Sequence, residues 1–194
     1  MDAFESHYSP DGLTRIALHY DEFGIEPHTD LRFVIMSRND YRFPNETRCD
    51  DGETIRSEAE ELKGGEKGII KPFYQYQHSG VAISLGREYP FNCPWDSGCA
   101  GLVVLPHDVA EDTPDPEAYL AAAFSEIASY VAGECFGSTK ETRNPDDLET
   151  WENVDSCWGF YGTPGADHHV FESAGVSPDE FKKWTEDDPL EDPD

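Results

Sequence analysis

The chain has 194 residues, of which 41 are Asp or Glu and 14 are Lys or Arg, so its formal net charge is −27. This length can bury the core of one large domain. A surface this acidic repels nucleic acid and anionic lipid, which disfavours direct binding to either. No run of about 20 apolar residues predicts a membrane span, and Met1 to Glu5 lack the basic and apolar regions of a signal peptide. We therefore expect a cytoplasmic protein, in the host cytoplasm if it is viral, with one domain over residues 1–184 and an acidic disordered tail over 185–194.

The cysteines are odd in number and unevenly spaced, which is typical of free thiols in a reducing compartment. They are Cys49, Cys93, Cys99, Cys135 and Cys157. The chain has no paired Cys-x-x-Cys motif, no calcium-loop spacing and no glycine-rich phosphate loop. We therefore expect neither a metal nor a cofactor.

The first half of the chain predicts strands around one short helix. Short apolar runs bounded by Gly and Pro predict strands at Leu13 to Tyr20 and Leu31 to Ser37, which could pair directly. A short acidic helix is predicted over Thr54 to Leu62, because Gly64-Gly65 follows it. Glycine and proline then divide Ile69 to Leu105 into four strand-like segments, which indicates a meander or a stack of hairpins.

The second half predicts one long helix and one more strand. Over Glu117 to Phe136, apolar side chains recur at helical spacing and form one face. A polar stretch, Gly137 to Thr150, separates this helix from an aromatic strand at Trp151 to Tyr161. Ser177, Pro178 and Glu180 predict a last short helix that ends near Trp184. The expected fold is α+β, with a mostly antiparallel twisted sheet of about five to seven strands, one long amphipathic helix and short extra helices.

Three motifs carry side chains that could do chemistry: Tyr76-x-His78-Ser79-Gly80, the segment from Cys93 to Gly101, and Asp155-Ser-Cys-Trp-Gly-Phe-Tyr-Gly162. A nucleophile, either Ser97 or Cys157, could in principle meet a base and a carboxylate. One interpretation is therefore an enzyme of unknown reaction. Its pocket would be lined by Tyr76, His78, Trp95, Asp96, Asp155, Cys157 and Trp158.

A structural interpretation of the same motifs is favoured. Neither serine lies in a Gly-x-Ser-x-Gly nucleophile elbow, and no Cys/His protease signature is present. Ser-Gly and Asp-Ser-Gly are common in hairpin turns. On this interpretation Trp95 and Trp158 are core rings and His78 is half-buried, so we assign no catalytic residue.

The three motifs, in this order, resemble an uncharacterised family of small acidic proteins from phages, plasmids and integrated mobile elements. The similarity runs from about Leu31 to about Val176. An acidic, proline-rich connector from Asp108 to Pro116 and the acidic tail depart from the family pattern. The resemblance implies a mobile-element origin and an accessory role, such as disarming a host defence.

The net charge has two explanations. Crowded carboxylates keep a protein soluble at high salt, which would suit a salt-adapted structural or interaction protein. Carboxylates can also mimic DNA phosphates and occupy the basic cleft of a host restriction or CRISPR effector. Together with the resemblance, the charge favours a non-enzymatic inhibitor of this second kind. Its contact residues would be Asp50, Asp51, Glu53, Glu58, Glu60 and Glu61, then Asp108, Glu111, Asp112 and Asp115, then Asp146, Asp147 and Glu149.

Overall fold

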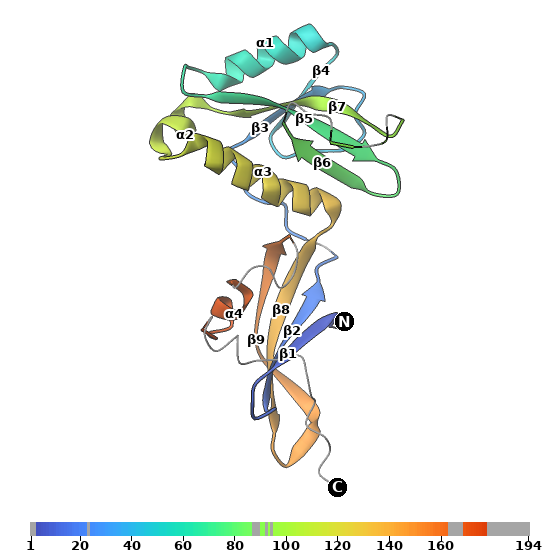
Figure 1. The fold of residues 1–194 in the computed structure, drawn as a ribbon, viewed down its shortest axis with the longest axis vertical. Helices are drawn as coiled ribbons and strands as arrows, with labels where there is room; N and C mark the ends of the chain where they lie inside the picture. Colours follow the sequence, from blue (N-terminus) through green and yellow to red (C-terminus); the bar gives the residue numbers. More distant parts are fainter. Residues whose placement is uncertain are drawn as a thin grey trace. The chain divides into compact units, whose positions relative to one another are not determined.

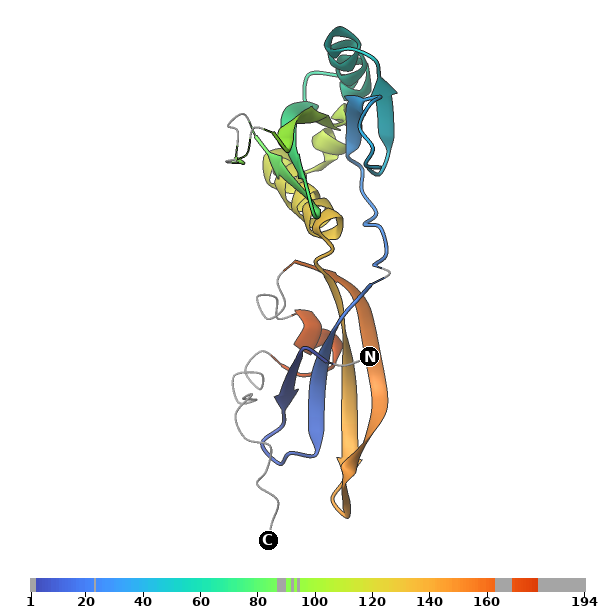
Figure 2. The same ribbon diagram turned by 90° about the vertical axis from the view of Figure 1, so that its right-hand side faces the viewer.

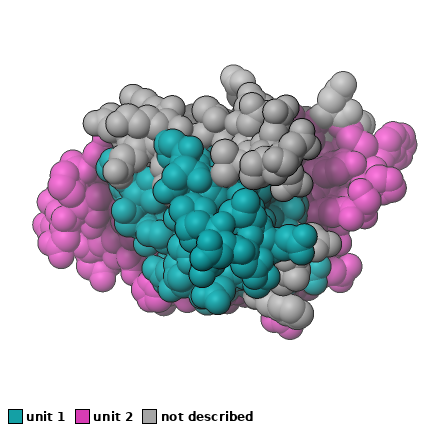
Figure 3. Space-filling model, turned by 90° about the horizontal axis from the view of Figure 1, so that it is seen from below, with its two compact units in different colours: residues 1–25, 133–194 teal, residues 26–132 magenta. Residues whose placement is uncertain are grey.

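A computed structural model describes residues 3–22, 24–86, 90–91, 93, 95–162 and 169–177. The chain forms two compact units, which Figure 3 colours separately. Unit 1 comprises Met1–Ile25 and Gly133–Asp194, and unit 2 comprises Glu26–Ala132. The single domain expected over 1–184 stays a prediction, and the expected tail lies outside the described residues.

Unit 2 is built on a five-stranded sheet with the order β4-β3-β7-β5-β6 (Figure 1). The strands are β3 (Arg32–Met36), β4 (Glu46–Cys49), β5 (Ile69–Gln77), β6 (Val81–Leu85) and β7 (Ser97–Leu105). Only the β3–β4 pair is parallel. The predicted meander therefore forms one side of this sheet, because β5 pairs with both β6 and β7.

Helices cover both faces of the unit 2 sheet. Helix α1 (Gly52–Lys63) packs Ile55 and Ala59 against Val34 and Val104 on one face. On the other face, α2 (His107–Asp112) and α3 (Pro116–Ala132) cover a core in which Phe33, Phe43, Phe73 and Phe124 are in ring contact. The two cores are separate because successive strand residues point to opposite faces of a sheet.

Unit 1 is a four-stranded antiparallel sheet with the order β1-β2-β8-β9. Its strands are β1 (Glu5–Tyr8), β2 (Thr14–Tyr20), β8 (Cys135–Asn144) and β9 (Asp147–Tyr161). The short helix α4 (His169–Ser173) covers one face of this sheet (Figure 2). Its Val170 and Phe171 pack against Ile16, Leu18 and Phe136 to form the core.

The expected fold class is confirmed, with nine strands and four helices among the described residues. The two early strands exist as β2 and β3, but they do not pair, since they belong to different sheets. The prediction that residues 137–150 form a polar connector is wrong, because most of these residues lie in β8 and β9. The long helix ends at Ala132, where Gly133 has a φ of +75°, and Cys135 already belongs to β8.

Three further predictions concern the C-terminal helix, membrane-spanning helices and the cysteines. The helix predicted from Ser177 to Trp184 lies outside the described residues beyond Ser177. Of the helices that the structure describes, none is both long and apolar enough to cross a bilayer. Among the described cysteines, Cys49, Cys99, Cys135 and Cys157 are free thiols.

Candidate functional site

The first two motifs lie side by side in unit 2, and the third lies in unit 1. Tyr76 is paired with Ser97 across β5 and β7, and the Gln77 amide donates to the Asp96 carbonyl at 2.8 Å. The segment from Asp155 to Tyr161 lies in β9. The pocket residues suggested by the sequence therefore divide into Tyr76, His78, Trp95 and Asp96 in one unit and Asp155, Cys157 and Trp158 in the other.

The unit 2 motifs form local turn contacts. His78 is exposed in the β5–β6 turn, where its amide donates to the Gly80 carbonyl at 3.1 Å. The Ser97 hydroxyl donates to the Cys93 carbonyl, and the Cys93 thiol donates to Asp96 Oδ2 at 3.3 Å. The bond between Ser97 and Cys93 joins residues that are four apart in the sequence, so it is a local contact of the kind found in turns.

The expectation that both tryptophans are core rings and that His78 is half-buried is wrong. Trp95 is 93% exposed and Trp158 is 41% exposed. The Trp158 ring instead lies against Gly137 on the neighbouring strand, where an added Cβ would be 2.2 Å from the indole. Glycine is therefore required at position 137, because a side chain there would occupy the space of the Trp158 ring from the edge strand β9.

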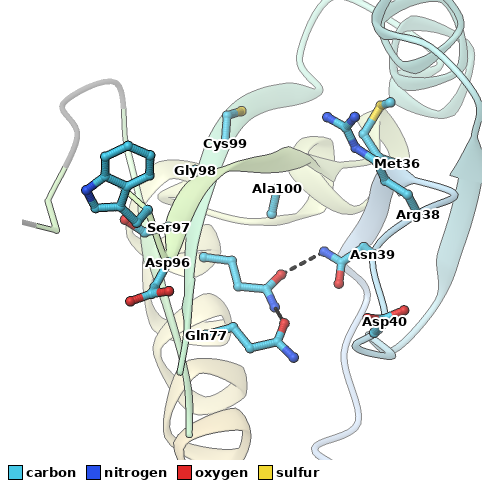
Figure 4. A pocket seen from close by; sticks show the side chains of 12 residues that line it. Met36, Arg38, Asn39, Asp40, Gln77, Asp96, Ser97, Gly98, Cys99 and Ala100 are labelled. Atoms are coloured by element: carbon cyan, nitrogen blue, oxygen red, sulfur yellow. Dashed lines mark hydrogen bonds between the residues drawn. The ribbon is translucent and has the colours of Figure 1, made fainter. Parts of the chain in front are cut away.

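A hollow of about 320 Å³ opens beside the second motif (Figure 4). Its lining comes from the end of β3 and the segment after it, and from the start of β7 and the two residues before it, with two side chains from β5. The lining residues are Met36, Arg38, Asn39, Asp40, Gln75, Gln77, Trp95, Asp96, Ser97, Gly98, Cys99 and Ala100. We refer to this feature as the hollow.

The hollow exists because β3 and β7 separate at this point. Their pairing ends at Ile35 and Gly101, whereas β7 continues back to Ser97. At Gly101 the strands approach so closely that an added Cβ would be 2.1 Å from the Val34 carbonyl oxygen. Beyond this point the segment after β3 leaves the sheet, and the space that a neighbouring strand would fill becomes the hollow.

A chain of side-chain amides crosses the floor of the hollow. Gln75 is 7% exposed, accepts a hydrogen bond from Asn39 Nδ2 at 2.7 Å and donates to Gln77 Oε1 at 3.1 Å. Asn39 Oδ1 in turn accepts from the Tyr41 amide at 2.9 Å. These bonds fix which end of each amide is a donor, so the amide orientations are set before any ligand arrives.

Arg48 holds the segment that supplies one wall of the hollow. Its guanidinium donates to the carbonyl oxygens of Ser37, Asn39 and Tyr41, and it is paired with Glu46 at 2.8 Å. Burial raises the pKa of Glu46, but hydrogen bonds from Arg48, the Phe43 amide and Arg42 outweigh it, so the pKa lies below its ordinary value. The carboxylate therefore stays charged and keeps Arg48 in place at neutral pH.

No family model, curated protein or solved structure matches this chain. The resemblance to the mobile-element family thus stays a prediction that depends on the three motifs alone.

The first acidic cluster, Asp50, Asp51, Glu53, Glu58, Glu60 and Glu61, lies at the start of α1 and along it. Asp51 is its N-cap, and the carboxylate accepts hydrogen bonds from the Glu53 and Thr54 amides at 2.8 Å each. One member of the cluster therefore has a structural role. Asp50, Glu53, Glu60 and Glu61 are exposed.

The second acidic cluster, Asp108, Glu111, Asp112 and Asp115, lies on α2 and just before α3. Glu111 is paired with Lys67 at 3.1 Å, and Asp115 accepts a hydrogen bond from the Ala118 amide at 3.0 Å. Because α1 and α2 cover opposite faces of the sheet, the first and second clusters do not form one continuous acidic face of unit 2. The third cluster, Asp146, Asp147 and Glu149, lies at the β8–β9 turn of unit 1.

Sequence reasoning missed the amides of the hollow. Asn39, Gln75 and Gln77 match no catalytic motif at their spacing in this sequence, so their residue types carried no signal. A spacing signal did exist, because residues two apart in a strand lie on the same face. Gln75 and Gln77 in a predicted strand therefore indicated two amides side by side.

Proposed function

We propose that this protein is a non-enzymatic acidic accessory protein that binds a host protein with a basic nucleic-acid-binding cleft, in the host cytoplasm. The observation that carries the proposal is the first acidic cluster. It places four exposed carboxylates, those of Asp50, Glu53, Glu60 and Glu61, on or beside one twelve-residue helix. Such a group attracts a basic cleft over distances of about 10 Å in moderate salt.

Two observations favour α1 over the other clusters. Burial first, and then the nearby charges of Glu58, Asp51 and Asp50, raise the pKa of the Cys49 thiol, as expected next to concentrated negative charge. Each cluster has one lysine pair, but Lys67 lies 3.1 Å from Glu111 in the second acidic cluster, whereas Lys63 lies 3.8 Å from Glu60 on α1. The α1 side of unit 2 therefore offers the carboxylates to which a cationic partner would be attracted most strongly.

Competition with DNA tests the proposal. A purified restriction enzyme and a Cas effector loaded with its guide are each bound to fluorescent duplex DNA, and the chain is added at increasing concentration. The chain should displace DNA from at least one of them, and its apparent affinity should fall steeply as NaCl rises. Neutralising the α1 carboxylates with Glu53→Gln, Glu60→Gln and Glu61→Gln together should weaken displacement about tenfold or more.

A matched variant controls for the loss of net charge alone. The substitutions Asp108→Asn, Asp112→Asn and Glu126→Gln together remove an equal number of negative charges, but from the opposite face of the unit 2 sheet. This variant should displace DNA nearly as well as the unmodified chain. Equal loss in both triple variants, or no displacement by the unmodified chain, would refute the assignment to α1.

A further inference from the structure

We propose that the hollow of unit 2 is a binding site for a neutral carbohydrate. The proposal does not depend on the acidic clusters, because it uses the amides, the exposed indole and the shape of the β3–β7 separation. A volume of about 320 Å³ is at the lower end of the range for small-molecule sites. One or two sugar rings are the appropriate size of ligand.

The polar groups of the hollow require a ligand that both donates and accepts hydrogen bonds at neighbouring atoms. Asp40 and Asp96 carry carboxylates that can only accept, whereas Arg38 can only donate. The amides of Asn39 and Gln77 offer both kinds of group within the same floor. A sugar hydroxyl is donor and acceptor at once, so a row of hydroxyls matches this mixture without leaving a charge unpaired.

The indole of Trp95 supplies an apolar surface at the rim. It is 93% exposed, although tryptophan normally buries most of its ring. Trp95 comes directly before Asp96 in the lining, and Figure 4 shows Asp96 and Ser97 on one side of the hollow, with Arg38, Asn39 and Asp40 on the other side. The C–H face of a sugar ring can pack on an exposed indole while its hydroxyls reach the amides.

The lining is already ordered, which reduces the entropic cost of binding. Gln75 is buried and holds Gln77 and Asn39 in register. Arg48 fixes the Ser37 to Tyr41 segment through three carbonyl oxygens. Neither the floor nor this wall has to rearrange to present its hydrogen-bonding groups.

The charges of the hollow argue against anionic ligands. Asp40 and Asp96 outnumber Arg38, and the whole chain carries −27, so a phosphate or another anion is repelled. An uncharged nucleoside could stack its base on the single exposed indole, but it would bring few hydroxyls to the amides on the floor of the hollow. A nucleoside is therefore the comparison ligand in the test.

The experiment is an NMR titration of the full ¹⁵N-labelled chain. The probes are glucose, galactose, mannose, N-acetylglucosamine, maltose and cellobiose, with uridine and cytidine as comparators, each to about 20 mM, well above a dissociation constant of about 1 mM. At least one sugar should shift the side-chain amide signals of Asn39, Gln75 and Gln77 together with the Trp95 indole signal. The same titration in high NaCl should give an unchanged dissociation constant, because the ligand is neutral.

Two glycine variants separate filling of the hollow from loss of the fold. Gly98 is paired with Gln75 and lines the hollow, and an added Cβ there meets nothing within 4 Å. Gly98→Leu should therefore fill the hollow and raise the dissociation constant at least tenfold. Gly80 has the same free space but lies in the β5–β6 turn, so Gly80→Leu should bind like the unmodified chain. Trp95→Ala should also weaken binding without unfolding the chain, because the ring is exposed.

Three results would overturn the proposal: no sugar shifts these signals, a nucleoside binds more tightly than every sugar, or Gly80→Leu weakens binding as much as Gly98→Leu. The α1 triple variant should bind the sugar normally. Failure of sugar binding and failure of DNA displacement are therefore distinguishable.

Discussion

Gly101 lies where β3 and β7 approach closely, and its replacement tests the geometry that creates the hollow. In Gly101→Ala, the new Cβ would lie 2.1 Å from the Val34 carbonyl oxygen and 3.0 Å from the Ile35 Cα, both of which are backbone atoms. The strands must move apart, so the free energy of unfolding should fall by about 1–3 kcal/mol. Urea denaturation measures this loss.

A second glycine of the same motif provides the control. An alanine at Gly98 meets nothing within 4 Å, so Gly98→Ala should change the free energy of unfolding by less than about 0.5 kcal/mol. Equal losses for the two variants would contradict the close approach at Gly101.

The sequence pattern identified the segment from Cys93 to Gly101 as a motif, but it did not indicate the role of each residue in the fold. Turn chemistry accounts for Ser97 and its bond to the Cys93 carbonyl, which is a local contact. The requirement at Gly101 comes from Val34, which is far away in the sequence, so local pattern could not reveal it. The exposure of Trp95 was missed for another reason. Aromatic residues are buried only on average, so residue type alone does not show which of them are exposed.

At the scale of elements, the start of α1 depends on the Asp51 carboxylate. Hydrogen bonds from the Thr54 amide and hydroxyl and from the Glu53 amide hold its pKa below the ordinary value of 3.8. A depressed pKa means that the stabilisation is present above the unfolded-state pKa and is lost as the pH falls through the folded-state pKa. The first turn of α1 should therefore loosen in acid.

Hydrogen exchange of the Glu53 and Thr54 amides measures this effect. Asp51→Ala should speed their exchange, corrected for intrinsic rates, several-fold at about pH 7, because both amides lose their acceptor. Asp51→Asn should retain most of the protection, but without the loss that the unmodified chain shows as the pH falls through the lowered pKa of Asp51. Asp50→Ala removes the neighbouring carboxylate and should leave exchange unchanged. Faster exchange in that control would instead indicate a general effect of charge.

Element type was predictable where the pattern is local, and element pairing was not. The apolar spacing at Leu120, Phe124, Ile127 and Val131 predicted α3, and all four residues are buried. Strand β8 was missed because its residues are mostly polar, and its pairing with β2 on one side and β9 on the other is a non-local feature. The division into two sheets depends on contacts between residues 1–25 and residues beyond 132, which no local window contains.

At the scale of the whole molecule, a net charge of −27 predicts that salt stabilises the fold. Carboxylates that repel one another in the folded chain are farther apart once it unfolds, so repulsion lowers the stability most when screening is weakest. The screening length shortens from about 30 Å at about 0.01 M salt to about 3 Å at about 1 M. The melting temperature should rise by about 5 °C or more over this range of NaCl, since each kcal/mol shifts it by about 2–4 °C in a chain of this size.

Calorimetry at about pH 7 measures the midpoint, and the same series near pH 4 is the control, because partial protonation of the carboxylates should reduce the effect of salt. A melting temperature that does not change with NaCl at neutral pH would mean that self-repulsion is not significant, and salt adaptation would then no longer explain the composition.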